Sequence, residues 1–176
     1  MLPRLNGPRI ALVPVPRELA RAVVTGDGIP AALELLGLRA GAGWPHEDTA
    51  DALRPLAEHG AEGDDGGWLV VLDGEVVGDC GWRGGADAAG DVLLGYGLAA
   101  PARSSGLGTE AVAVLCAWAE RQPGVRRLVA EVHVDNEPSR RLLRRLGFVE
   151  EPDDPPWVRC VRGHGSTPRI RGRHVC

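Results

Sequence analysis

The fold is decided by residues 92–121, which read VLLGYGLAAPARSSGLGTEAVAVLCAWAER. Residues 92–98 alternate in a way that predicts a β-strand, and a glycine-rich turn follows at residues 103–108. Residues 109–121 then combine strong helix formers with an acid in the first turn and a base in the last, ahead of Pro123. The sequence therefore predicts a strand, a tight turn and a helix in direct succession.

The glycines of this stretch have two separate consequences. Gly95 and Gly97 lie inside the predicted strand, where they indicate a bulge or a close approach of backbone. In the turn, glycines let successive amide N–H groups converge, and the helix N-terminus adds about half a positive charge. Such a turn suits a pyrophosphate, and Arg103 would add a mobile cation.

Three other interpretations of this turn can be compared with a pyrophosphate site. A Walker loop needs a lysine after its glycines, but Thr109 and Glu110 follow Gly108. Residues 95–100 match the G-x-G-x-x-A pattern of dinucleotide-binding folds, yet Pro101 comes next and no helix opens there. The third alternative is a turn that only connects a strand to a helix. The residues of the turn alone do not decide between this connector and a phosphate site.

Upstream of this stretch the pattern is mixed. Residues 10–15 are predicted to form a strand, and residues 19–24 a helix that stops at a pair of glycines. Residues 29–43 fit no single element. A second helix is expected from a cap at Asp48 or Thr49 to residue 57.

Short strands alternate with turns and helices elsewhere. Strands are expected at residues 68–72, 75–82 and 127–134, a helix at residues 138–146, and two short strands within residues 148–161. Asp73 and Gly74 form a hairpin turn between the first two strands. The fold class is α/β (α+β), a largely antiparallel sheet with a parallel crossover made by the helix of residues 109–121.

The domain organisation follows from length and pattern. With 176 residues and 44% hydrophobic residues, the chain has material for one core, so we expect one domain at residues 1–162. Residues 163–176 are rich in Gly, Arg and His and lack apolar periodicity. We expect this tail to be disordered.

Composition and charge argue against several classes of protein. A net charge of −4 argues against nucleic-acid binding, for which a basic surface is expected. No apolar run approaches the roughly 20 residues of a membrane helix, and no secretion signal precedes the first strand, so we expect a cytoplasmic protein. Zinc-ligand spacing and a disulfide pattern are both missing from the four cysteines, Cys80, Cys116, Cys160 and Cys176. No metal is therefore expected.

Two motifs in the same order resemble those of one enzyme family. Residues 103–108, RSSGLG, are similar to the Q/R-x-x-G-x-G/A motif of the GNAT superfamily of N-acetyltransferases. Residues 136–148, NEPSRRLLRRLGF, are similar to its N-x-x-[AS]-x-x-L-Y-x-x-x-G-F segment. The strings GYGL at residues 95–98 and WP at residues 44–45 resemble the branch that contains ribosomal-protein N-terminal acetyltransferases. The resemblance extends over roughly residues 10–161 and is specific only over residues 92–148.

The resemblance implies a GNAT-like fold and a site for acetyl-CoA as co-substrate. The fold would be a mixed, mainly antiparallel sheet with a parallel, splayed strand pair and helices on both faces. The pyrophosphate would be held by the amides of Arg103, Ser104, Ser105, Gly106, Leu107, Gly108 and Thr109. The pantetheine arm would lie along Leu98, Ala99, Ala100, Asn136 and Ser139. An amide N–H near Leu98 or Ala99 would polarise the thioester carbonyl.

The amine must be neutral when it attacks, so a general base is useful. Glu131 occupies the position, five residues before Asn136, where some N-terminal acetyltransferases of the family place a glutamate base. Asn136 is the second candidate at the catalytic centre. Glu131 also fits as a surface or cross-strand charge partner, because it and Asn136 differ in strand parity. His133 shares the face of Glu131 and is a residue type that suits a base, although a lone strand histidine is more often structural.

The chain departs from the family pattern at Leu143, where many members have the tyrosine that protonates the leaving thiolate. Tyr96 is the only tyrosine in the sequence, and we expect it first as a packed strand aromatic and second as a wall of the acceptor site. Trp44, beside Pro45, is also expected to line the acceptor pocket.

We therefore expect an N-acetyltransferase that passes the acetyl group of acetyl-CoA to a primary amine by direct attack in a ternary complex. The alternative is a non-catalytic acyl-CoA-binding or regulatory module, favoured by Leu143 and by the lack of an unambiguous base. The sequence does not decide whether the acceptor is a small-molecule amine or a peptide N-terminus. The family resemblance also suggests a homodimer.

Overall fold

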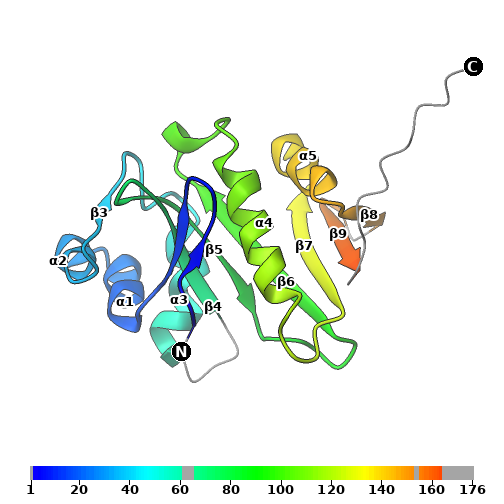
Figure 1. Cartoon of the computed structure of the whole chain (residues 1–176), viewed down its shortest axis with the longest axis horizontal. Helices are drawn as coiled ribbons and strands as arrows, with labels where there is room; N and C mark the ends of the chain where they lie inside the picture. Colours follow the sequence, from blue (N-terminus) through cyan, green and yellow to red (C-terminus); the bar gives the residue numbers. More distant parts are fainter. Residues whose placement is uncertain (1, 61–65, 153–154, 164–176) are drawn as a thin grey trace, which may run out of the picture.

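The computed structural model describes residues 2–60, 66–152 and 155–163 of the chain. Its strands form a nine-stranded sheet in the order β1-β2-β4-β5-β6-β7-β9-β8, with β3 beside β5 (Figure 1). Within these residues, no helix has the length and apolar character needed to cross a bilayer.

The helices and strands occur in the predicted order. The strands are β1 (Leu5–Asn6), β2 (Ala11–Pro14), β3 (Arg39–Ala40), β4 (Gly66–Leu72), β5 (Glu75–Arg83), β6 (Asp91–Leu98), β7 (Arg127–His133), β8 (Val149–Pro152) and β9 (Trp157–Gly163). The helices are α1 (Arg17–Thr25), α2 (Ile29–Glu34), α3 (Thr49–His59), α4 (Leu107–Ala119) and α5 (Glu137–Arg145), with a 3-10 turn, η2 (Ala100–Ala102). The ambiguous residues 29–43 thus contain a short helix and a two-residue strand.

Two strand pairs among the described residues are parallel. One is the short pair of β3 with β5, which the sequence did not predict. The other is β6 with β7, joined through α4 as expected. Pairing of β6 with β7 runs only from Asp91 with Arg127 to Leu93 with Val129. The predicted splay is confirmed, because the two strands separate beyond Leu93.

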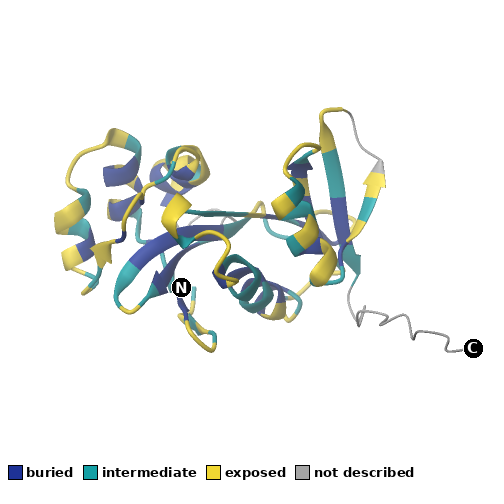
Figure 2. Ribbon diagram, turned by 90° about the horizontal axis from the view of Figure 1, so that it is seen from above, coloured by how far each residue is buried: buried dark blue, intermediate teal, exposed yellow. Residues whose placement is uncertain are grey.

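Helices cover both faces of the sheet, and each face has its own core. On one face α4 and α5 pack over a cluster that includes Leu115, Leu128 and Leu143. On the other, α1, α2 and α3 pack over residues such as Leu69, next to Val70 of the first cluster. Neighbouring strand residues point to opposite faces, which explains this division. Figure 2 shows the buried residues along the sheet and the inner sides of the helices, with the outer turns exposed.

The hairpin between β4 and β5 was predicted correctly. Leu72 pairs with Glu75 around the two-residue loop of Asp73 and Gly74. Both loop residues are left-handed, with φ of 50° and 79°, as a type I′ turn requires. The predicted bulge is not in β6, because the register shift of these strands lies in β4, between Val70 and Val71.

Two helix boundaries differ from the prediction for physical reasons. Helix α4 begins at Leu107 and not at residue 109, because Gly106 caps it in the left-handed region and Leu107 packs into the core. It ends at Ala119, so Arg121 is not in the last turn. Asp48 precedes α3 as its cap residue but makes no side-chain capping hydrogen bond.

The C-terminal boundary shifts by one residue. Strand β9 continues through Gly163, which the sequence assigned to the tail. The rest of the predicted tail, residues 164–176, lies outside the described residues, as does Cys176. The other three cysteines, Cys80, Cys116 and Cys160, are buried free thiols, and burial raises the pKa of each.

Candidate active site

The turn between β6 and α4 has the backbone of an anion site. Ser104 and Gly106 are both left-handed, with φ of 63° and 83°, which reverses the chain direction before the helix. No side chain of the cap residue satisfies the amides of the first turn of α4, which begins at Leu107 and includes Gly108 and Thr109. These amides, together with the dipole of a thirteen-residue helix, fit the pyrophosphate predicted for this turn.

Hydrogen bonds from two polar side chains stabilise the turn. Arg103 donates from Nε to the carbonyl oxygen of Leu98 at 2.9 Å, and Ser105 donates from Oγ to that of Ala102 at 2.7 Å. Residues 103–106 are exposed. The turn therefore holds its shape through its own hydrogen bonds while it presents an open surface.

Arg9 adds a cation to this turn that the sequence analysis missed. Glu110, in the first turns of α4, accepts hydrogen bonds from the amides of Arg9 and Ile10 and from Arg9 Nε at 2.8 Å. Arg9 also donates from Nη1 to the carbonyl oxygen of Ser105 at 3.1 Å. Burial alone would raise the pKa of Glu110, but these hydrogen bonds together lower it. The carboxylate thus fixes a half-exposed guanidinium beside the glycine turn.

The opening between β6 and β7 starts directly before the turn. Ala99 donates its amide to Val77 of β5 at 2.9 Å, so that amide is not free for a substrate. Since peptide groups alternate along a strand, the amide of Leu98 faces away from β5 and toward the opening. Of the two amides predicted to polarise a thioester, the geometry therefore favours that of Leu98.

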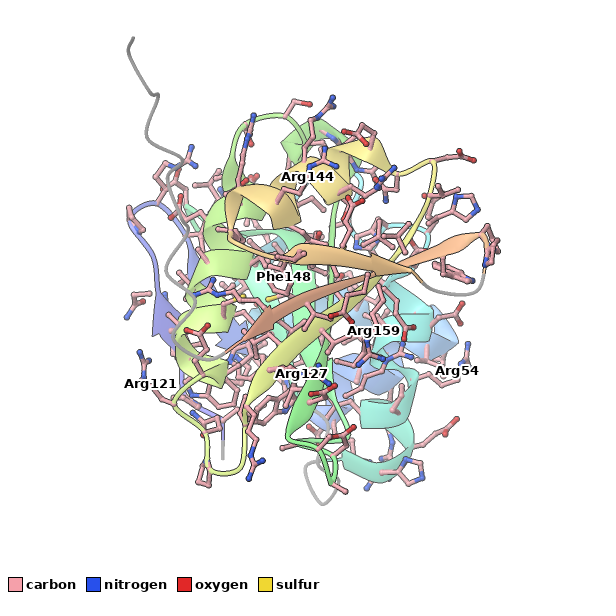
Figure 3. All side chains as sticks on the ribbon, turned by 90° about the vertical axis from the view of Figure 1, so that its right-hand side faces the viewer. Arg54, Arg121, Arg127, Arg144, Phe148 and Arg159 are labelled. Carbon is pink, nitrogen blue, oxygen red and sulfur yellow. The ribbon has the colours of Figure 1, made fainter. Side chains whose placement is uncertain are left out.

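An ionic clamp holds β6 and β7 together where they still pair. Asp91 accepts from Arg127 Nε at 2.7 Å and Nη2 at 2.6 Å, and from Arg159 Nη2 at 2.8 Å. Figure 3 shows Arg127 and Arg159 close to each other on the neighbouring strands β7 and β9. The buried Asp91 carboxylate is therefore well compensated. The strands are fixed at this end and separate toward Leu98.

The N-terminus of α5 lies at the other side of the opening. Asn136 caps the helix by accepting from the amide of Ser139 at 3.2 Å. The Ser139 hydroxyl is 2.5 Å from the hydroxyl of Tyr96, which reaches it from β6. Burial raises the pKa of Tyr96 to about 12, so its hydroxyl stays protonated. Tyr96 is thus brought to Asn136 and Ser139, the pair predicted to contact the pantetheine arm.

Leu143 occupies the position where the family pattern has a tyrosine. Its side chain is fully buried in the core cluster beneath α4 and α5. No hydroxyl is therefore available from this position of α5.

A cavity of about 310 Å³ lies on the opposite face of the sheet, between α3 and the strands β5 and β6. Gly95, Tyr96 and Gly97 of β6 form part of its wall, Tyr96 through its backbone, because its side chain points to the other face of the sheet, toward Ser139. The acidic lining residues are Asp48, Asp51 and Asp79, and the basic ones are His46 and Arg83. A cavity with this lining suits a cationic group. In the described part of the chain, no group of three or more His, Cys, Asp or Glu residues is placed to hold a metal ion.

His46 and Asp79 form a buried pair in the cavity wall, and neither was predicted. His46 Nε2 lies 3.1 Å from Asp79 Oδ2, with the two side chains only 6% and 5% exposed. The same carboxylate oxygen accepts from Thr49 Oγ1 at 2.9 Å and from Trp44 Nε1 at 3.3 Å. Among the described residues, buried Nε2 has this carboxylate as its polar contact and no other hydrogen-bond partner.

Gly97 explains how this histidine fits against the sheet. A Cβ atom at Gly97 would overlap the His46 ring, whereas one at Gly95 would meet nothing within 4 Å. The close approach predicted for the strand glycines thus exists at Gly97, but a side chain makes it. The glycine was a signal for such a contact, although the sequence did not identify its partner.

Trp44 does not line the cavity. Its side chain is buried in the second core cluster and contacts the site only through its hydrogen bond to Asp79. His46, two residues later, lines the cavity instead.

Glu131 and His133 lie outside this cavity. Glu131 is exposed on β7, opposite Arg159 of β9. His133 packs edge-on against Trp157, with ring centroids 5.7 Å apart, and its Nδ1 is 3.6 Å from a carboxylate oxygen of Asp135. Both residues share the sheet face of Gly95 and Gly97, because Asp91 pairs with Arg127 and each strand alternates from there.

Comparison with known proteins gives a family match and a curated relative. Residues 13–149 match the model of the family described as acetyltransferase (GNAT) domain. The chain is 31% identical over 125 residues to an uncharacterized N-acetyltransferase, YjdG, of Bacillus subtilis (strain 168). This match covers 67% of the chain and 74% of that protein.

Solved structures show the same fold. RimL, a ribosomal L7/L12 alpha-N-protein acetyltransferase in complex with coenzyme A, has a TM-score of 0.66 at 17% identity, over 94% of this chain and 100% of that one. Mycobacterium smegmatis RimJ in complex with CoA-disulfide has a TM-score of 0.63 at 24% identity, over 95% and 88%. The ribosomal-protein-S5-alanine acetyltransferase from Vibrio fischeri has a TM-score of 0.66 at 16% identity, over 95% and 100%.

Proposed function

Because this chain belongs to the GNAT family of acetyltransferases, we propose that it transfers the acetyl group of acetyl-CoA to a primary amine by direct attack in a ternary complex. Family membership makes it an acetyl-CoA-dependent acyltransferase. It therefore disfavours the alternative of a non-catalytic binding module, even though Leu143 stands where a tyrosine is usual. The acceptor and the order of events belong to the proposal.

One observation supports direct attack above the others. The opening between β6 and β7 has the glycine turn at its end and the acidic cavity on one face of the sheet, and Gly95 and Gly97 of β6 border that cavity. Two substrates bound at these places would meet at Leu98 without a covalent enzyme intermediate. Nearness and orientation of the two reactants are a large part of such catalysis.

The residues around the turn fit acetyl-CoA. Amides from Arg103 to Thr109 would hold the pyrophosphate, and the guanidinium of Arg9 would add a charge-assisted contact. Leu98, Ala99 and Ala100 would run along the pantetheine, with its far side against the α5 N-terminus at Asn136 and Ser139. In this arrangement Asn136 acts through the helix cap that it forms. The free amide of Leu98 would polarise the thioester carbonyl.

The acidic cavity supports an amine as acceptor. A primary amine is mostly an ammonium ion at neutral pH, and Asp48, Asp51 and Asp79 would attract it. RimL and the Vibrio fischeri enzyme are named for acetylation of proteins, which supports a peptide N-terminus among the candidates. A small-molecule amine fits the same chemistry.

Initial-rate kinetics with both substrates varied test this function. A panel of peptides with free N-termini and of small primary amines should contain at least one acceptor. For that acceptor, reciprocal plots should intersect, as expected when both substrates are bound before transfer. Parallel lines would mean a covalent acetyl-enzyme and would contradict direct attack. Binding of acetyl-CoA without transfer to any amine would contradict the acceptor class.

A further inference from the structure

We propose that His46, backed by Asp79, is the general base that takes the proton from the acceptor ammonium. This inference rests on the proposed function and assigns its proton-accepting group. Sequence reasoning gave Glu131 for this role, from the resemblance alone. The structure supplies a second candidate, inside the cavity that the acceptor would enter.

The hydrogen-bonding of the imidazole identifies the basic nitrogen. The amide of Asp48 donates to His46 Nδ1 at 3.4 Å, so Nδ1 has the lone pair and Nε2 has the proton in the neutral ring. Nε2 then faces the Asp79 carboxylate at 3.1 Å. A carboxylate on one nitrogen stabilises the imidazolium that forms when the other nitrogen takes a proton. The contact from Asp48 is long, so little is lost when a substrate replaces it.

Asp79 is held in place for this task. Thr49 and Trp44 both donate to the oxygen that faces His46, and the residue is 4% exposed. A buried carboxylate is costly unless it is hydrogen-bonded or paired with a charge. Two neutral donors do not neutralise its charge, so the site favours a cation beside it. Asp79 is therefore a positioning residue that acts through His46.

His46 is also placed where the chemistry has to occur. The Cε1–Nε2 edge of its ring lies directly against Gly97, the residue before Leu98, whose amide faces the opening, and Nδ1 lies on the side of the ring nearer the Asp48 amide. An amine in the cavity would have the imidazole on one side and the β6–β7 opening on the other. No comparable placement exists for Glu131, which is exposed and is not among the residues that line the cavity.

The charges around His46 support a base that works near neutral pH. The hydrogen bond with the Asp79 carboxylate is the largest influence and raises the pKa of His46, while burial lowers it. The negative charges of Asp79 and Asp48 raise it further, and Arg103 lowers it. Asp51 of α3 is the remaining acid of the cavity wall, and it is paired with Arg54 at 3.1 Å. The net result is a pKa above the ordinary value of 6.5.

The proton balance of the step is simple. His46 Nδ1 takes one proton from the ammonium, and the resulting neutral amine attacks the thioester carbonyl. The C–N bond forms and the C–S bond breaks, so the acetyl group moves to nitrogen. The second proton lost from nitrogen ends on the sulfur of free CoA. His46 then returns its proton to solvent, and the net products are the amide, CoA and one proton.

The test is the pH profile of kcat/KM for wild type, His46→Gln and Asp79→Asn. The acceptor should be an active amine with an ordinary pKa of about 10.4, so that its own titration stays outside the measured range. Wild type should show a rising limb with its midpoint above pH 6.5. His46→Gln should lose this limb and about 100-fold or more in kcat, the usual share of a general base. Asp79→Asn should move the limb to lower pH, because the carboxylate that raises the pKa is gone.

Matched measurements keep a folding defect distinct from a catalytic one. Acetyl-CoA affinity by calorimetry should be the same in His46→Gln as in wild type, because the glycine turn does not include this residue. His59→Gln, the same substitution in the exposed last turn of α3, should keep the full rate and the full limb.

Two outcomes would overturn the inference. One is a limb that persists in His46→Gln and disappears in Glu131→Gln, which would assign the base to Glu131. The other is that neither Asp79→Asn nor His46→Gln changes kcat or the rising limb of the pH profile. A wild-type protein that binds acetyl-CoA but acetylates no amine would instead refute the proposed function, and the inference with it.

Discussion

Gly97 is the residue on which the position of His46 depends most directly. A methyl group there would overlap the imidazole, so Gly97→Ala should displace the ring or the strand and lower the free energy of unfolding by about 1–3 kcal/mol, the usual cost of overpacking. Gly95→Ala, two residues earlier on the same face with open space around it, should change stability by much less. Urea denaturation of both variants measures this. Equal losses would mean that the His46 contact does not constrain the strand.

Arg9 is the second single residue with a specific expected effect. Its guanidinium lies beside the turn, so Arg9→Gln should weaken acetyl-CoA binding about tenfold or more, from the loss of one charged hydrogen bond of about 1.5–3 kcal/mol. Calorimetric titration measures the affinity. Arg121→Gln removes an exposed arginine just beyond the opposite end of α4 and should leave the affinity unchanged (Figure 3). The same loss in both variants would exclude a local role for Arg9.

Single residues also mark the limit of sequence reasoning. Arg103 and Gly106 belong to a local motif of one continuous turn, so their positions could be predicted from residues that are neighbours in the chain. His46 and Asp79 are 33 positions apart, and Arg9 and Glu110 are 101 apart. No local pattern links such pairs, because the strand order and register bring them together. Trp44 was therefore placed at the cavity when His46, two residues later, is there.

At the scale of elements, the first turn of α4 is the part on which the proposed cofactor site depends. A side chain at Gly108 would press against the tips of Leu142 and Leu98, at 3.3 and 3.4 Å from a Cβ atom, and would crowd the amides of the turn. Gly108→Val should therefore reduce acetyl-CoA affinity below detection in a calorimetric titration. Ala117→Val puts the same branched side chain on the exposed side of α4 and should retain binding. Unchanged affinity in the Gly108 variant would refute this cofactor site.

The elements themselves were predictable where the hydrophobic periodicity agrees with the residues that end a helix or strand. The hairpin at Asp73 and Gly74 and the end of α1 at Gly26 follow from residues that favour the left-handed region, and both are observed. The parallel pairing of β3 with β5 was not predictable, because a two-residue strand has no periodicity. Helix α4 began earlier than expected because Gly106, and not Gly108, is its left-handed cap.

At the scale of the whole molecule, buried ionisable groups should give stability a defined pH range. The pKa of His46 is raised in the folded state, so its contribution is complete below its unfolded value of about 6.5 and is lost as pH rises through the folded value. Glu150 of β8 accepts hydrogen bonds from Arg140 and Arg144 of α5, and these lower its pKa, as those from Arg9 and Ile10 lower that of Glu110. The contributions of both carboxylates are present above the unfolded value of about 4.3 and are lost as pH falls through the folded values.

Urea denaturation across pH should therefore show a fall in stability on the acid side and another above neutrality. His46→Gln should remove the alkaline fall and leave the acid one. If the stability of His46→Gln declines above neutral pH as it does in wild type, the His46–Asp79 pair does not contribute to folding in this way.

In the proposed arrangement the two substrates bind at separate places, acetyl-CoA at the glycine turn and the amine in the acidic cavity. The most direct test is the pair of KM values, for acetyl-CoA and for a cationic amine, in the double variant Asp48→Asn, Asp51→Asn. Exposed ion pairs contribute about 0.2–1 kcal/mol each, so the KM for the amine should rise about three- to tenfold while the KM for acetyl-CoA stays constant. A rise in the KM for acetyl-CoA, with that for the amine unchanged, would contradict the account.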